Sequence, residues 1–169
     1  WTEKKPDEFI VTFETYGGTV SGKPIDSQIV VDGDTVVRPA DPVKEGHDFE
    51  GWYTDDAFAE KFSFRTPITQ NTTIYAKWKA HTFEVTFESF GGSDVAPQVV
   101  EYGKTLTRPE DPTKSGYTFV GWYLDRYLTE PYDFNSPVTF EFTLYAEWVI
   151  VVPNKYVVTF VNEGSTSIP

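Results

Sequence analysis

Short stretches of the chain alternate between apolar and polar residues. Phe9, Val11 and Phe13 occupy every second position, a pattern typical of a strand with one buried face. The same alternation returns over residues 83–87. No stretch keeps the period of about 3.6 residues that indicates an amphipathic helix. The pattern therefore predicts a chain built mostly from short strands.

The strand pattern occurs twice because much of the sequence occurs twice. Residues 49–53 read Phe-Glu-Gly-Trp-Tyr, and residues 119–123, about 70 positions later, read Phe-Val-Gly-Trp-Tyr. Two flanking motifs, Arg-Pro-x-Asp-Pro and Tyr-Ala-x-Trp, return at the same interval. A repeat this long predicts that each copy is a small domain. The expected strands of the first copy are 9–14, 28–31, 49–53 and 72–78.

A short helical element is considered between the second and third strands of each copy. Asp41 and Pro42 carry the signals of a helix start, and Gly46 carries that of a helix stop. Because so few residues separate these signals, they predict a single helical turn or a capped turn. Each copy is expected to be mainly β, with about four strands and minimal helix.

The repeat also divides the chain into segments. We expect repeat domains at 8–79 and 83–148, joined by a short linker at 80–82. Since this linker contains neither Gly nor Pro, it favours a stiff connection. The remaining segments are expected to be a leader or linker at 1–7, a second linker at 149–155 and the truncated start of a third repeat at 156–169.

The composition narrows the possible partners. The net charge is −12, and both copies are acidic, without a basic patch that could neutralise phosphates. Nucleic acid and anionic membranes are therefore poor candidates, and the acidity is expected to keep the repeats soluble and apart. The absence of Cys excludes a disulfide or a thiolate site. Because the chain has no Met and opens at Trp1, we expect it to be a piece of a longer protein.

The acidic turn Asp32-Gly33-Asp34 is the strongest candidate for a metal site, because calcium loops carry carboxylates at alternating positions. The second copy has Lys104 where the first has Asp34, and Asp-Gly is also a common turn sequence. We therefore expect a turn here and no metal.

The sequence also gives little support for catalytic residues. Asp55 and Asp56 suggest a carboxylate pair for acid–base chemistry, but Asp56 corresponds to Arg126 in the second copy. His47 corresponds to Tyr117, and without Cys or a recurring His a nucleophilic triad has no base. We expect no catalytic residues, no cofactor and no enzymatic activity.

The aromatic residues of the third strand allow two interpretations. Trp52 and Trp122, with Tyr53 and Tyr123, could form a platform on which a sugar ring stacks. A small domain, however, needs its large rings in the core. We expect the two tryptophans to be buried, whereas Tyr53 and Tyr123 are kept as possible ligand contacts.

The motifs together resemble the Listeria–Bacteroides repeat, also called the internalin B-repeat, of bacterial surface proteins. The resemblance rests on Val-Thr-Phe followed by Gly-Gly, then Arg-Pro-x-Asp-Pro-x-Lys-x-Gly-x-x-Phe-x-Gly-Trp-Tyr, then Tyr-Ala-x-Trp. Both copies carry all three parts, over about 9–78 and 83–148, and the third start departs slightly, with Glu163-Gly164 in place of Gly-Gly. The resemblance implies a β-grasp or ubiquitin-like fold in a secreted, often wall-anchored, bacterial adhesin, and it supplies no catalytic residues.

These observations lead to one main functional hypothesis and one alternative. The main hypothesis is a non-enzymatic stalk, spacer or adhesive repeat segment of a bacterial cell-surface, internalin-like protein, which is secreted and associated with the cell wall. The alternative is a module that binds a glycan or a host protein through exposed aromatics or the insertion loop at 19–28. Neighbouring repeats of the parent chain are further possible partners. No apolar run approaches the roughly 20 residues of a membrane span, so we expect no direct membrane insertion of this segment.

Overall fold

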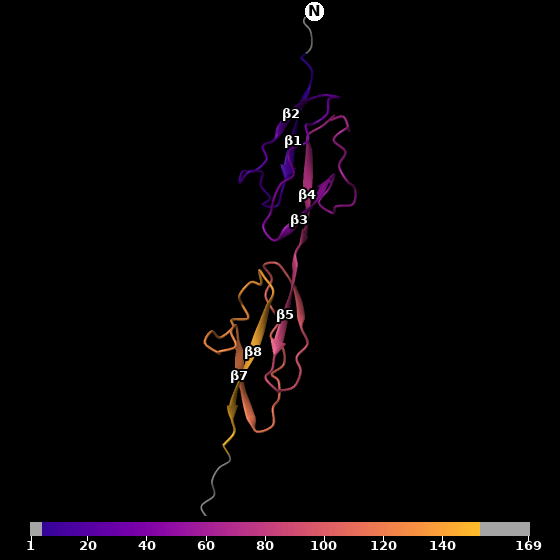
Figure 1. Cartoon of the computed structure of the whole chain (residues 1–169). Helices are drawn as coiled ribbons and strands as arrows, with labels where there is room; N and C mark the ends of the chain where they lie inside the picture. The colour runs from indigo at the N-terminus through magenta and orange to yellow at the C-terminus, as the bar shows by residue number, and fades with distance from the viewer. Residues whose placement is uncertain (1–4, 153–169) are drawn as a thin grey trace, which may run out of the picture. The chain divides into compact units, whose positions relative to one another are not determined.

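The computed structural model describes residues 5–152 and contains two four-stranded β-sheets (Figure 1). No helix is present among these residues. The expected start of a third repeat at 156–169 lies outside the described residues.

The described chain forms two compact units. The first unit extends to Val85 and also includes Pro97–Arg108 and Asp133–Phe142. The second unit consists of Thr86–Ala96, Pro109–Tyr132 and the chain from Thr143 onward. The first unit therefore contains the whole first copy of the repeat together with part of the second.

The first sheet consists of β1 (Glu8–Glu14), β2 (Gln28–Val31), β3 (His47–Tyr53) and β4 (Thr72–Ala80). Its strands lie in the order β2-β1-β4-β3. β1 is antiparallel to β2 but parallel to β4, and β3 is antiparallel to β4. The first and last strands of the repeat are thus neighbours that run in the same direction.

The second sheet consists of β5 (Thr82–Glu88), β6 (Gln98–Glu101), β7 (Tyr117–Tyr123) and β8 (Phe142–Ile150). Its order, β6-β5-β8-β7, repeats that of the first sheet. β6 is antiparallel to β5, and β7 is antiparallel to β8. The strands predicted from alternation are confirmed, with small differences at their ends.

The helical turn considered between Asp41 and Gly46 does not form. The N–H group of Val43 donates to the carbonyl of Thr19 at 2.8 Å, and the carbonyl of Val43 accepts from the N–H group of Thr19 at 2.9 Å. A helix needs such groups for bonds within its own turns, so pairing with the loop after β1 excludes it. The prediction of a mainly β structure is confirmed.

The core of the first repeat lies on one face of its sheet. Alternation brings Val11 and Phe13 of β1 and Ile74 of β4 to this face. The opposite wall of the core comes from loops, in the place where many small proteins have a helical layer. The buried cluster consists of Val11, Phe13, Val30, Val36, Trp52, Ile68, Ile74 and Ala76.

A β-bulge in β3 brings Trp52 into this core. The register of β3 against β4 shifts between Phe49 and Gly51, which makes Glu50 the extra residue. Strict alternation would put Phe49 and Trp52 on opposite faces, but the shift brings both to the core face. Their rings pack edge to face, with centroids 5.4 Å apart.

Trp78 joins the end of β4 to the turn after β1. Its Nε1–H donates to the carbonyl of Thr15 at 2.9 Å, and its ring lies where a Cβ atom on Gly18 would overlap it. The amine of Lys44 lies over the same ring, 5.8 Å from the centroid. Residues from all three sequence motifs therefore form one structural cluster.

The second copy builds the same cluster with its own residues. The Nε1–H of Trp148 donates to the carbonyl of Ser89 at 2.7 Å, and a Cβ atom on Gly92 would overlap the Trp148 ring. The amine of Lys114 lies 5.6 Å from that ring's centroid and donates to the carbonyl of Phe90 at 2.6 Å. The recurrence indicates that these motif residues stabilise the fold.

Replacing Ile74 by Ala should destabilise the first repeat strongly. Ile74 is 0% exposed, so the substitution leaves a cavity and is expected to cost about 2–5 kcal/mol of unfolding free energy. Ile29→Ala is the matched control, because Ile29 is 72% exposed and should cost less than about 1 kcal/mol. Urea denaturation followed by circular dichroism measures both. Equal costs would contradict the one-sided core.

Gly18→Ala should displace the Trp78 ring and weaken its bond to Thr15. Overpacking of this kind is expected to cost about 1–3 kcal/mol. The indole N–H resonance of Trp78 in a proton–nitrogen NMR spectrum should shift, while that of Trp148 stays in place. Gly92→Ala is the control and should give the opposite result. A Trp78 resonance that does not respond to Gly18→Ala would contradict this packing.

Candidate functional site

Trp52 and Trp122 are buried, with 3% and 2% of their surfaces exposed. The prediction that both belong to the core is confirmed. Indole rings enclosed in this way present no face to a sugar, so a stacking platform built on the tryptophans is excluded.

Tyr53 and Tyr123, the candidate ligand contacts, lie at the ends of β3 and β7. Tyr53 is buried, because Phe58 packs edge to face against it at 5.7 Å and the amine of Lys77 lies 5.4 Å from its ring centroid. Tyr123 is partly exposed, and its hydroxyl donates to Glu147 at 2.5 Å. This hydrogen bond, followed by desolvation, raises the pKa of Tyr123. A ligand contact at either tyrosine stays a prediction.

Three further aromatic residues, Tyr16, Phe58 and Tyr75, pack together beside Tyr53, and we call them the outer aromatic group. Tyr75 lies opposite Tyr53 on the sheet face away from the core. Tyr16 stacks on Tyr75 with centroids 6.5 Å apart and meets Phe58 edge to face at 6.3 Å. This is a cluster of rings on the outer face of the sheet.

Two members of the outer aromatic group have left-handed backbone conformations. Tyr16 has φ 49° and Phe58 has φ 55°, values that cost energy for a residue with a Cβ atom. In the second copy Phe90 has φ 49° and stacks on Tyr145 at 5.8 Å. Tyr16 is 43% exposed and Phe90 38% exposed. Both copies therefore present a ring from a strained backbone position.

A groove of about 550 Å³ runs from the outer aromatic group along β4. Its lining includes Tyr16 and Phe58, then Trp78 with Lys44, while Asp56 adds a negative charge. The pairing of β1 with β4 ends at Tyr75, whereas β4 continues to Ala80. The groove therefore follows the part of β4 that extends past β1.

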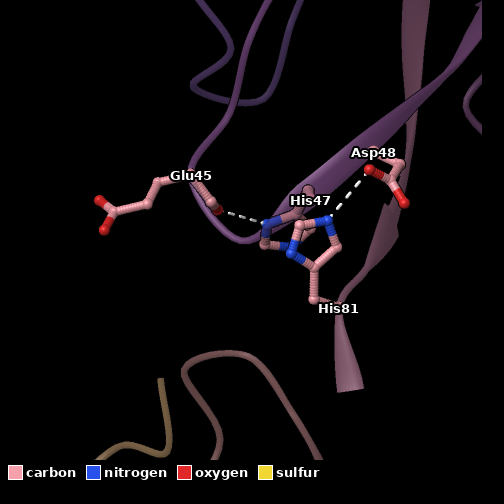
Figure 2. Close-up of polar contacts among 4 residues, drawn as sticks. All are labelled: Glu45, His47, Asp48 and His81. Atoms are coloured by element: carbon pink, nitrogen blue, oxygen red, sulfur yellow. Dashed lines mark hydrogen bonds and ion pairs between the residues drawn. The ribbon is translucent and has the colours of Figure 1, made fainter. Parts of the chain in front are cut away.

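Both histidines of the chain lie near the start of β3 (Figure 2). His81 Nε2 lies 3.0 Å from Asp48 Oδ1, and His47 Nδ1 lies 2.8 Å from the carbonyl of Glu45. The hydrogen bond with His81 holds the pKa of Asp48 below its usual value, against a smaller effect of desolvation. Thr118 replaces Asp48 in the second copy, so this pair is not a recurring feature of the repeat.

Tyr102, in the turn after β6, lies against the same loop. Its ring meets that of His47 edge to face, with centroids 6.0 Å apart. A hydrogen bond with Glu45, followed by desolvation, raises the pKa of Tyr102. A Cβ atom on Gly46 would overlap the Tyr102 ring. The side chain is thus held by three consecutive residues of the loop.

Asp55, considered as a catalytic residue, and its counterpart Asp125 accept hydrogen bonds from the backbone of their own loops. The carboxylate of Asp125 accepts hydrogen bonds from the N–H groups of Tyr127, Thr129 and Glu130 at 2.8–2.9 Å. Desolvation raises the pKa of Asp125, but these hydrogen bonds outweigh it and lower the pKa overall. Asp55 accepts similarly from the N–H group of Ala59 at 3.3 Å. The carboxylates stabilise turns.

The segment Asp32-Gly33-Asp34 forms the predicted turn. The N–H group of Asp34 donates to the carbonyl of Val31 at 2.9 Å, and that of Gly33 donates to the carbonyl of Ile68 at 2.9 Å. Across the described part of the chain, no group of three or more His, Asp or Glu side chains is arranged to hold a metal ion.

The insertion expected at 19–28 is a surface loop over residues 19–27, and Gln28 already begins β2. Val20 and Lys23 exchange backbone hydrogen bonds at 2.9 and 3.0 Å and form a tight hairpin within it. Ile25 turns inward and packs against the core. One side chain therefore anchors a loop whose other residues largely face solvent.

Two features were missed by sequence reasoning. The first is the outer aromatic group, for which an aromatic residue directly before each Gly-Gly, Tyr16 and Phe90, was the available signal. The second is the contact of Tyr102 with Gly46. Its counterpart in the first copy is Asp32, so the aromatic character of this turn does not recur and gave no pattern to detect.

No helix within residues 5–152 is long and apolar enough to cross a membrane.

The chain is similar to parts of much longer proteins. A protein of Evansella cellulosilytica that is named as a membrane protein is 42% identical over 93% of this chain, and the match covers 23% of that protein. A second protein of that organism, named as a Gly-rich membrane protein, is 39% identical over 95% of this chain and 18% of its own length. Internalin H of Listeria monocytogenes is 37% identical over 52% of this chain and 16% of its own length. The chain thus spans less than a quarter of each of these relatives.

The sequence profile of the Listeria-Bacteroides repeat domain matches residues 9–77 and again residues 83–147. The first match contains Gly18 and Lys44, the second contains Gly92 and Lys114, and each match ends one residue before the tryptophan of its cluster. The chain belongs to the Listeria-Bacteroides repeat domain family and carries two copies of that repeat.

Proposed function

We propose that this chain is a non-enzymatic spacer within the stalk of a bacterial cell-surface protein, where it transmits tension between the segments on either side of it. The family and the similarity to Internalin H support a repeat module of a surface protein. Secretion, association with the cell wall and an adhesive role of the parent protein are parts of the same proposal.

One observation carries the proposal: β1 and β4, the first and last strands of the repeat, are parallel neighbours. Their pairs run from Val11↔Thr72 to Glu14↔Tyr75. Tension along the chain pulls β1 by its start and β4 by its end, which are opposite ends of the pair. The strands must then slide past each other, so the hydrogen bonds between them resist together.

The same strand order supports a β-grasp assignment. The central pair is parallel and each outer strand is antiparallel to its neighbour, in the order β2-β1-β4-β3. We propose a β-grasp variant in which loops cover the sheet face on which a helix would otherwise pack. Loop residues Val36 and Ile68, both buried, support this view.

The direction of pulling should decide the unfolding force of the first repeat. Because the chain contains no Cys, Cys handles can be placed freely. Handles at Lys5→Cys and Lys79→Cys pull β1 and β4 in shear, whereas handles at Lys5→Cys and Gln70→Cys pull both strands from the same end. We expect a clearly higher unfolding force for the shear pair in single-molecule force spectroscopy, because its hydrogen bonds break together.

The second pair of handles is the control for the first, since protein, sheet and core are the same. Thermal unfolding of both double-Cys variants should match that of the parent chain. Equal unfolding forces in the two geometries would remove the mechanical argument for a spacer.

A second candidate function is glycan binding at the outer aromatic group, and the exposure of Tyr16 favours it. Phe90 has the equivalent position in the second copy and is also exposed. Rings held at left-handed φ keep a stacking surface in place, and such strain is often found at functional sites. The groove along β4 is lined by the rings of Tyr16 and Phe58. A glycan of the host surface is the partner that fits this candidate.

If the outer aromatic group binds sugars, Tyr16→Gly should abolish binding without unfolding the chain, because Gly removes the ring and tolerates the left-handed backbone. A glycan array, followed by NMR titration with any ligand found, makes this measurement. Tyr127→Ala is the control, because Tyr127 is exposed but lies outside the group. Binding that survives Tyr16→Gly, or resonance changes away from Tyr16 and Tyr75, would argue against this site.

A further inference from the structure

The loop at Glu45–His47 and the turn at Tyr102 belong to different copies of the repeat but to one compact unit. That unit contains the first copy and extends through Pro97–Arg108, which surrounds Tyr102. Only His81 separates the end of β4 at Ala80 from the start of β5 at Thr82. His81 is therefore the one residue between these strands at which the chain direction can change.

Backbone hydrogen bonds hold His81 on both sides. Its N–H group donates to the carbonyl of Gly46 at 2.8 Å, and its carbonyl accepts from the N–H group of Tyr102 at 2.8 Å. The linker residue thus connects the loop before β3 with the turn after β6. A change in its backbone angles would break one or both bonds.

The side chain of Tyr102 adds contacts that a backbone bond cannot supply. Its ring occupies the space beside Gly46 and meets the rings of His47 and Phe83 at 6.0 and 6.4 Å. The carboxylate of Glu45 raises the pKa of its hydroxyl. The absence of a Cβ atom on Gly46, whose φ is 67°, makes this close approach possible.

The equivalent positions of the two copies show which contacts of His81 and Tyr102 recur elsewhere in the chain. Val151 N–H donates to the carbonyl of Gly116 at 2.9 Å, and Asp32 N–H donates to the carbonyl of Asp7 at 2.8 Å. These bonds reproduce the two bonds of His81. Gly116 has φ 79°, but no atom of the described chain lies within 4 Å of a Cβ atom built on it. The backbone bonds recur, whereas the aromatic contact is specific to Tyr102.

We propose that the Glu45–His47 loop is a docking surface for the turn of the repeat that follows it, with Tyr102 as the inserted side chain that restrains the hinge at His81. The docked residue is Tyr102, which directly follows β6, and its ring packs against Gly46. This inference stands independently of the spacer function, because it concerns only the joint.

The test measures the spread of distances across the joint. Ile29→Cys and Val99→Cys place spin labels at equivalent exposed positions of β2 and β6 in the full chain. Double electron–electron resonance should give one narrow distance distribution. Tyr102→Asp should broaden it, and this variant is expected to fold because the first copy carries Asp32 at that position.

Gly46→Ala should broaden the distribution as well, because its methyl group displaces the ring. Gly116→Ala is the matched control: it places Ala at a similar positive φ but meets no ring, so the distribution should stay narrow. Tyr102→Phe should also leave it narrow, since the ring remains. Circular dichroism checks that every variant is folded.

Three results would overturn the proposal. The first is a parent distribution that is already as broad as that of Tyr102→Asp. The second is a narrow distribution in both Tyr102→Asp and Gly46→Ala. The third is equal broadening by Gly46→Ala and Gly116→Ala, which would assign the effect to backbone strain and not to the ring.

Discussion

The structure depends on one constraint: a sheet with an apolar face must cover that face, and this repeat has no helix among its described residues with which to do so. The cover comes from loops that carry single apolar side chains inward, such as Val36 and Ile68. Loops can keep these side chains buried only if their own backbone N–H and C=O groups are hydrogen-bonded. The many turn hydrogen bonds, including those to Asp125, meet that need.

The motifs of the family follow from the same constraint. Large rings bury much area per residue, which suits a small core closed by loops. The indole of Trp78 fastens the turn after β1 to the end of β4, and Gly18 and Lys44 shape its surroundings. The most recognisable residues of the sequence therefore hold the loops on the sheet, while candidate binding residues such as Tyr16 lie on the other face.

The sequence predicted the parts of the fold that local patterns determine. Alternating apolar residues located the strands, and the repeat located their counterparts, because both signals come from residues close together in the chain. The signals at Asp41–Gly46 left a helical turn and a capped turn open, and the chain does turn between Lys44 and His47. The helical alternative was wrong because its signals are local, whereas the bonds of Val43 reach back to Thr19. The inward turn of Trp52 was expected from its size, but the bulge at Glu50 that produces it depends on the register with β4. The contact of Tyr102 with Gly46 was not predictable, because it joins residues far apart in sequence and does not recur.

The parallel arrangement of β1 and β4 also bears on how such proteins evolve. The chain enters a repeat at the start of β1 and leaves it at the end of β4, travelling in the same direction along the sheet. A duplicated copy inserted after β4 can therefore begin its own first strand without a connection that crosses back over the sheet. Here one residue, His81, suffices between β4 and β5. Gene duplication can lengthen a protein of this kind at little topological cost, and the number of copies is then free to vary between relatives.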